Sequence, residues 1–290
     1  MRRSCWTRRP TRPTVPRRRA DLAGYLPAAA AERAAQYAAL GLSGPEALYR
    51  DVPESVRLTA PLNLPPPQSE LEARRTLEAL AEQNLRFRTI LRGAGAYDHY
   101  IPAAVSRIAS KEEFVTAYTP YQAEISQGVL QSIFEFQTMI CELTGLDAAN
   151  ASVYDGASAA AEAVAMCRER KRTRAVVSAA AHPDVISTIR TYSFGAGTEV
   201  AAAPAENGVT NLTGLLDETT ACVYVQQPNF FGQLEDLPAL AAQVHAAGAR
   251  LIVGVNPAAL GVLESPGACG ADIAVGEGQP LGLPLSWGGP

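Results

Sequence analysis

Short apolar runs alternate with helical patterns through the second half of the chain. The runs are rich in Val, Ile and Ala, and they cover residues 174–179, 199–202, 221–226, 251–255 and 271–275. Strands that are buried on both faces of a parallel sheet have this composition. Helical periodicity separates most of the runs, so the alternation predicts an α/β domain with a doubly wound, mainly parallel sheet and right-handed crossovers.

The region before this alternation has no strand pattern. Residues 27–41 and 69–84 have helical periodicity, and the Pro-rich residues 51–67 between them are predicted to be extended. Residues 25–92 are therefore predicted to form a helical and extended N-terminal arm. Residues 93–290 are predicted to form the α/β domain.

Two loops rich in tyrosine and other polar residues precede a strongly amphipathic helical segment. The loops cover residues 93–102 and 117–128, and the helical segment covers residues 129–147. Polar side chains need hydrogen-bond partners wherever they are buried. The residues alone leave two interpretations open: loops that are satisfied by their own backbone, or loops that hold a ligand.

A turn of small residues leads into an Ala-rich helix at residues 150–167. The start of such a helix can bind an anion through its free N–H groups. Asp155 would repel a phosphate there, so capping of the helix by Asp155 or Ser158 is at least as good an interpretation. His182 precedes another helical pattern, where a cap or a hydrogen-bonded loop residue is the alternative to a catalytic histidine.

Charge and cysteine content exclude several classes of protein. Residues 1–22 hold eight of the 25 basic residues and one of the 29 acidic residues. The remainder has a net charge of −11, which argues against a nucleic-acid-binding protein. No run approaches the roughly 18 uncharged apolar residues of a membrane-spanning helix. The five cysteines are widely spaced, without CxxC or Cys/His metal spacing, so no metal site is expected and reduced thiols in a cytoplasmic protein are predicted.

The first 24 residues are rich in Arg, Pro and Thr. An Arg-rich start with few acids is compatible with an organellar transit peptide, but the prolines break any amphipathic helix. We therefore predict a disordered extension, or a start codon that was assigned too far upstream. Nothing in the sequence supports a nucleic-acid-binding arm.

Loops of small or polar residues follow the last two predicted strands, at residues 256–257 and 276–280. Ligands of open α/β sheets bind at the carboxyl ends of the strands. A pyridoxal phosphate enzyme of the aspartate aminotransferase fold would place an Asp in the first loop and a Lys after the second strand. The chain has Asn256 instead, and no lysine follows Lys171. The sheet suits this cofactor, but the residue for its covalent attachment is missing.

Several long motifs, in this order, resemble one family. They are YTPYQAEISQG (118–128), FEFQTMICELTGLDAANASVYDGASAAAEA (134–163), VQQPNFFGQLED (225–236) and VNPAALGVLESPGACGADIAVGEGQPLGLPLSWGGP (255–290). They are similar to glycine dehydrogenase (decarboxylating) subunit 1, the non-lysine half of the P-protein of the glycine cleavage system. The resemblance covers about residue 25 to the end and implies the large domain of a fold-type I pyridoxal phosphate transferase. It also implies a small C-terminal domain, which would make this sequence a fragment or a truncated gene product.

The resemblance further implies a division of labour between two chains. A partner, glycine dehydrogenase subunit 2, would hold pyridoxal phosphate on its own lysine, in agreement with Asn256 and the missing Lys. The second tyrosine loop would face that cofactor. The implied site residues are therefore Tyr118, Thr119, Tyr121 and Gln122, with His99, Tyr100 and His182 as weaker candidates and no catalytic lysine in this chain.

Three functions remain open at this point. The chain could complete the partner's site, where glycine is decarboxylated and its aminomethyl group passes to the lipoyl carrier H-protein. It could be a non-catalytic scaffold that only stabilises the partner subunit. It could also be an autonomous pyridoxal phosphate enzyme, against which the missing lysine argues strongly.

Overall fold

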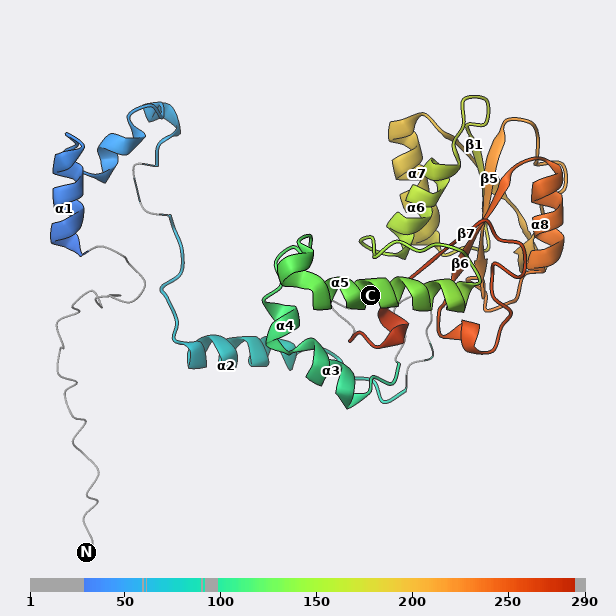
Figure 1. The fold of residues 1–290 in the computed structure, drawn as a ribbon, viewed down its shortest axis with the longest axis horizontal. Coiled ribbons are helices and arrows are strands. Elements are labelled where there is room, and N and C mark those ends of the chain that lie inside the picture. The colour runs from blue at the N-terminus through green and yellow to red at the C-terminus, as the bar shows by residue number, and fades with distance from the viewer. Residues whose placement is uncertain (1–28, 59, 61, 90, 92–98, 285–290) are drawn as a thin grey trace, which may run out of the picture. The chain divides into compact units, whose positions relative to one another are not determined.

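The computed structural model describes residues 29–58, 60, 62–89, 91 and 99–284. The predicted disordered extension at residues 1–24 and most of the first tyrosine loop lie outside the described residues. The chain divides into two compact units, Met1–Phe87 and Arg88–Pro290 (Figure 1). The predicted domain boundaries at residues 24 and 92 stay predictions.

The described residues of the first unit include four helices that have no buried core of their own. Its elements are α1 (Ala30–Ala39), the 3₁₀ helices η1 (Pro45–Tyr49) and η2 (Glu54–Val56), and α2 (Glu70–Ala81). A capping box starts α2: Ser69 Oγ accepts from the Glu72 N–H at 3.3 Å, and Glu72 Oε2 accepts from the Ser69 N–H at 2.8 Å. The predicted helices are thus confirmed, and no residue within any of the four elements is buried.

The second unit contains a five-stranded, wholly parallel sheet in the order β2-β1-β5-β6-β7. Its strands are β1 (Arg174–Ser178), β2 (Glu199–Ala203), β5 (Thr220–Gln227), β6 (Arg250–Val255) and β7 (Ile273–Gly276). The helices that alternate with them are α6 (Gly156–Cys167), α7 (Pro183–Ala196) and α8 (Leu237–Ala246). Figure 1 shows α6 and α7 on one side of the sheet and α8 on the other. The predicted doubly wound sheet is confirmed.

Both faces of the sheet are buried, and neighbouring residues of one strand serve different faces. In β1, Val177 packs in a cluster with residues of α6 and α7, whereas Val176 packs in a cluster with residues of α8. Val223 and Tyr224 of β5 divide between the clusters in the same way. Each buried side chain of this size contributes about 1.5–3 kcal/mol. Burial on both faces therefore explains why these strands have continuous apolar sequences.

A small hairpin lies beside the sheet and was not predicted. It consists of β3 (Ala205–Glu206) and β4 (Val209–Thr210), which pair in antiparallel fashion. Asn207 and Gly208 connect them with φ of 51° and 85°. Two consecutive residues with positive φ are typical of a tight hairpin turn, and Asn-Gly is its preferred sequence.

Three further helices precede the sheet: α3 (Ala103–Ala109), α4 (Glu112–Val115) and α5 (Ala123–Thr144). The predicted amphipathic helix is confirmed, but the prediction of a loop over residues 117–128 is wrong in its second half. Gln122 has the extended backbone of an N-cap, and α5 begins directly after it, with a kink at Ser126. Polar residues therefore occupy the first turns of a helix instead of a loop.

The C-terminal end of α5 is fixed to the turn that precedes β7. Gly145 ends the helix with φ of 69°, and the Gly267 N–H donates to the Thr144 carbonyl oxygen at 2.9 Å. A Cβ on Gly267 would lie 2.1 Å from the Gly145 oxygen, so this approach requires a glycine. The remainder of α5 stays largely exposed, including Phe134 at 65% and Met139 at 61%. No helix of the described residues is long and apolar enough to cross a membrane.

Candidate functional site

The loops at the carboxyl ends of β1, β5, β6 and β7 form the edge of the sheet where an open α/β fold binds ligands. They contribute His182, Asn229, Asn256 and Glu277, each within a few residues of its strand. We call this edge, with these four residues, the crevice. Their hydrogen bonds decide whether the crevice is free for a ligand.

Hydrogen bonds to Gln226 and Asp184 hold His182 in place. Its backbone N–H donates to Gln226 Oε1 at 2.8 Å, and its Nδ1 accepts from the Asp184 N–H at 3.1 Å. The ring stands edge-on to Phe230, with 5.2 Å between centroids and an interplanar angle of 87°. Because Nδ1 is an acceptor, a neutral ring carries its proton on Nε2. His182 therefore caps α7, as one interpretation of the sequence predicted.

A buried network fixes the loop after β5. Glu235 is only 6% exposed, and its carboxylate accepts from the Thr210 N–H, from Thr210 Oγ1 and from Asn229 Nδ2, each at 2.9 Å. Ser178 Oγ lies 2.7 Å from Thr210 Oγ1 and joins β1 to the same network. Glu235 and Asn229 were not predicted as site residues, because no local sequence pattern shows that the β3–β4 hairpin supplies their hydrogen-bond partners.

The loops after β6 and β7 are also satisfied from within the chain. Asn256 Oδ1 accepts from the Ala258 N–H at 3.0 Å, which is a local turn. Glu277 Oε1 accepts from the N–H of Gly156, the first residue of α6, at 2.5 Å. Asp155 Oδ1 caps the same helix through the Ser158 N–H at 2.6 Å. Capping by Asp155, one of the two predicted caps, is confirmed, while the contact of Glu277 was not foreseen.

The residues of the crevice do not fit covalently held pyridoxal phosphate. Such a site needs a lysine, a carboxylate for the pyridinium nitrogen and a place for the phosphate. The chain has two lysines: Lys111 directly precedes α4, and Lys171 precedes β1, at the opposite end of the sheet from the crevice. Asn256 carries no charge, and two carboxylates occupy the start of α6.

The second tyrosine loop is exposed instead of closed on itself. Tyr118 is 94% and Tyr121 is 84% exposed, and Thr119 and Gln122 are exposed as well. Backbone hydrogen bonds order the loop, from the Tyr121 N–H to the Thr119 oxygen at 2.9 Å and from the Ser126 N–H to the Gln122 oxygen at 2.9 Å. Within the described part of the chain, none of the four side chains makes a hydrogen bond.

The weaker candidates do not assemble with this loop. His99 is half-buried and Tyr100 is 88% exposed, while residues 93–98 of their loop lie outside the described residues. Among residues 99–284, neither a hydrogen bond nor a ring contact joins the Tyr118–Gln122 loop to His182. The predicted residues therefore lie in three places: the exposed loop before α5, the segment before α3 with His99 and Tyr100, and the cap of α7 at His182. No cluster of three or more metal-ligating side chains occurs among the described residues.

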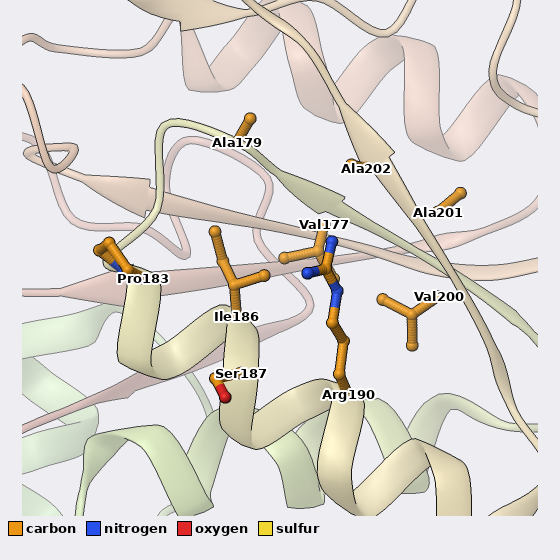
Figure 2. Close-up of a pocket in the computed structure, with 9 residues that line it drawn as sticks. All are labelled: Val177, Ala179, Pro183, Ile186, Ser187, Arg190, Val200, Ala201 and Ala202. Carbon is orange, nitrogen blue, oxygen red and sulfur yellow. The ribbon is translucent and has the colours of Figure 1, made fainter.

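A pocket of about 270 Å³ lies between α7 and the edge strand β2. Figure 2 shows Arg190 reaching along it, with Ile186 and Val177 on one side and Val200 on the other. Its remaining lining residues are small or apolar, except for Ser187. None of the predicted site residues lines this pocket, so it adds no group to the candidate site.

Comparisons with known proteins agree with the motifs. Residues 23–290 match the family model of the glycine cleavage system P-protein. Probable glycine dehydrogenase (decarboxylating) subunit 1 is 51% identical in Desulforamulus reducens and 50% identical in Carboxydothermus hydrogenoformans. Each comparison covers 92% of this chain and 61% of the relative.

A solved structure supports the same assignment. It is a crystal structure of glycine decarboxylase (P-protein) of the glycine cleavage system in inhibitor-bound form, with a TM-score of 0.84 and 44% identity. The similarity covers 92% of this chain and 61% of that one, so the chain spans about three fifths of the proteins it matches. The chain belongs to the glycine cleavage system P-protein family.

Proposed function

We propose that this chain belongs to the P-protein subunit that lacks the cofactor lysine and completes a decarboxylating site in trans. Membership of the family implies pyridoxal phosphate chemistry. A partner, glycine dehydrogenase subunit 2, holds pyridoxal phosphate on its own lysine in this proposal. The substrate is glycine, and the aminomethyl group passes to the lipoyl H-protein. The cofactor supplies the electron sink for the decarboxylation.

One contrast carries the proposal. The crevice of this chain uses its polar groups internally, whereas the Tyr118–Gln122 loop is ordered and displays its side chains to solvent. Two phenols, a hydroxyl and an amide can hold a substrate or cofactor that another chain supplies, because positioning needs fixed donors and acceptors and no nucleophile. Pro120 stiffens the turn between them. In the proposal, the loop orients glycine or the cofactor at the partner's site.

The location in the cell is part of the proposal. Cys141, Cys167, Cys222 and Cys269 are free thiols. The pKa of the Cys222 thiol is raised by its hydrogen bond to Cys167 and by burial, which keeps this thiol protonated. Reduced, buried thiols are typical of proteins in a reducing compartment. We therefore place the complex in the cytoplasm.

Mutation of the tyrosine loop tests the proposal in the complex reconstituted with the lysine-bearing subunit and H-protein. We expect Tyr118→Ala and Tyr121→Ala to leave assembly intact and to slow exchange of labelled bicarbonate into glycine. A displacement of about 1 Å in a bound reactant can slow a reaction roughly a hundredfold, so we expect the exchange rate to fall by up to that factor. Tyr192→Ala in α7 is the matched control, since that tyrosine is also exposed but lies far from the loop in sequence.

The scaffold alternative gives the opposite result in this assay. A non-catalytic scaffold would also have a crevice whose polar groups bond within the chain. The crevice therefore does not distinguish a scaffold from a subunit that acts in trans. Exchange at the wild-type rate in both loop variants, with the complex still formed, would establish the scaffold and refute a role in trans.

Reduction with borohydride tests the other claim, that this chain forms no covalent link to pyridoxal phosphate. We expect no stoichiometric, saturable adduct on Lys111 or Lys171, because neither lies at the crevice. Mass spectrometry of the reduced chain measures this, and the lysine-bearing subunit provides the positive control. A saturable adduct on either lysine would restore the autonomous enzyme as the explanation.

A further inference from the structure

Two carboxylates from distant parts of the chain meet at the start of α6. Asp155 precedes the helix and accepts from the Ser158 N–H at 2.6 Å, which is the usual bond of an N-cap to the third helical residue. Glu277 comes from the loop after β7, 121 positions further along the chain, and accepts from the Gly156 N–H at 2.5 Å. Asp155 alone therefore caps α6 in the usual way, and the hydrogen bond to Glu277 is additional.

The contact with Glu277 is closely fitted. Gly156 is buried, and a Cβ at this position would lie 3.1 Å from Glu277 Oε1 and 3.3 Å from its Cδ and Cγ. The carboxylate approaches this closely because residue 156 has no side chain. A second glycine allows the approach from the other side: a Cβ on Gly276 would lie 2.3 Å from the Val255 oxygen, so β7 ends close against β6 directly before Glu277. Glu277 is therefore placed by the end of the sheet itself.

The first N–H groups of a helix are the groups that bind phosphate in α/β proteins. Here two of them already donate to carboxylates, the Gly156 N–H to Glu277 and the Ser158 N–H to Asp155. A phosphate monoester would have to displace Glu277 and would then face the charge of Asp155. The start of α6 therefore resembles an anion-binding site in which the carboxylate of Glu277 takes the place of a bound anion.

We propose that Glu277 is a built-in anion that closes the start of α6 to phosphate monoesters, so that the crevice of this chain accepts no phosphate-bearing cofactor. The inference concerns this chain alone and does not depend on the function in trans. Failure of the tyrosine-loop experiment would leave it untouched.

Hydrogen exchange at the start of α6 tests the contact first. In the full chain, we expect the peptide that contains Gly156 to exchange roughly tenfold faster in Glu277→Ala than in wild type, as loss of one hydrogen bond implies. Glu277→Gln keeps an oxygen acceptor and should stay close to wild type. Glu264→Ala removes an exposed glutamate from the loop between β6 and β7 and is the matched control. Exchange of Glu277→Ala at the wild-type rate would refute the contact and the proposal.

The second test asks whether Glu277 excludes phosphate from the start of α6. Inorganic phosphate is added in one experiment, and pyridoxal phosphate without a reducing agent in another. We expect neither to slow exchange at Gly156 in wild type or in Glu264→Ala. In Glu277→Ala combined with Asp155→Asn, which removes the second charge and keeps an oxygen acceptor for the Ser158 N–H, millimolar phosphate should restore protection, because the freed Gly156 N–H donates to the new anion. Protection of the wild type by either compound would show that the site is open and overturn the proposal. Lost protection that phosphate does not restore would make Glu277 a structural contact only, which also overturns it.

Discussion

The two units of this chain stabilise their helices in different ways. In the first unit, α2 relies on its capping box, and Leu71, Leu77 and Leu80 on its surface are 55–66% exposed. In the second unit, α6 and α8 bury their apolar faces against the sheet, with Val164 and Val244 almost inaccessible. Local hydrogen bonds alone contribute about 1 kcal/mol at a helix end, whereas tertiary burial provides most of the stability of helices in proteins. The comparison implies that the exposed leucines of the first unit need a covering surface.

The largest effect is expected where the sheet is most tightly packed. Gly254 lies in β6, and a Cβ there would be 2.2 Å from Tyr224 Oη and 2.9 Å from its Cζ. Tyr224 is 2% exposed and cannot swing away. We expect Gly254→Ala to lower the free energy of unfolding of the second unit by about 3 kcal/mol, as overpacking does. Denaturant unfolding, followed by circular dichroism, measures it.

A matched glycine gives the opposite sign. Gly195 lies in α7, and nothing is within 4 Å of the position that its Cβ would occupy. We expect Gly195→Ala to raise stability by about 0.5 kcal/mol, because alanine loses less backbone entropy in a helix. Equal effects of both substitutions would mean that the packing around Tyr224 yields, and that the sheet is less rigid than its burial implies.

A local effect is expected in the arm. Ser69→Ala removes the hydroxyl that accepts from the Glu72 N–H and should destabilise α2 by about 1 kcal/mol. Since the residues of α2 are exposed, the unfolding midpoint of the second unit should not change. Hydrogen exchange of peptides from α2 and from β5 separates the two responses. A parallel loss of protection in β5 would show that the units unfold together.

The sequence was sufficient for elements that a local pattern defines. The apolar runs located all five strands of the large sheet to within two residues at each end, because burial on both faces leaves little room for polar residues. The start of α5 was misplaced because Glu124, Ser126 and Gln127 are as polar as a loop, although they lie in the first turns of the helix. The β3–β4 hairpin was missed although Asn207 and Gly208 carried its signal.

The candidate site was predictable only in part. Asn256 and the position of the lysines could be read directly, and so could the cap of Asp155. The contact between Glu277 and Gly156 could not, since it joins residues 121 positions apart and depends on how closely β7 ends against β6. Contacts of this kind follow from the register of the sheet, which no local pattern specifies.

The smallest expected effect concerns the pH dependence of the arm. Hydrogen bonds from the Ser69 backbone and side chain lower the pKa of Glu72 from its ordinary value of 4.5. A carboxyl whose pKa is lowered by folding contributes stability above pH 4.5, and this contribution is lost as the pH falls through the lower, folded value. The helix content of a peptide covering residues 66–84, followed by circular dichroism, should therefore decrease below pH 4.5. The peptide also contains Glu70, Glu78 and Glu82, so Glu72→Gln is the control, and the difference between the two peptides isolates the capping box. Identical pH profiles would show that the capping box contributes too little to the stability of α2 to be measured, and would contradict the prediction.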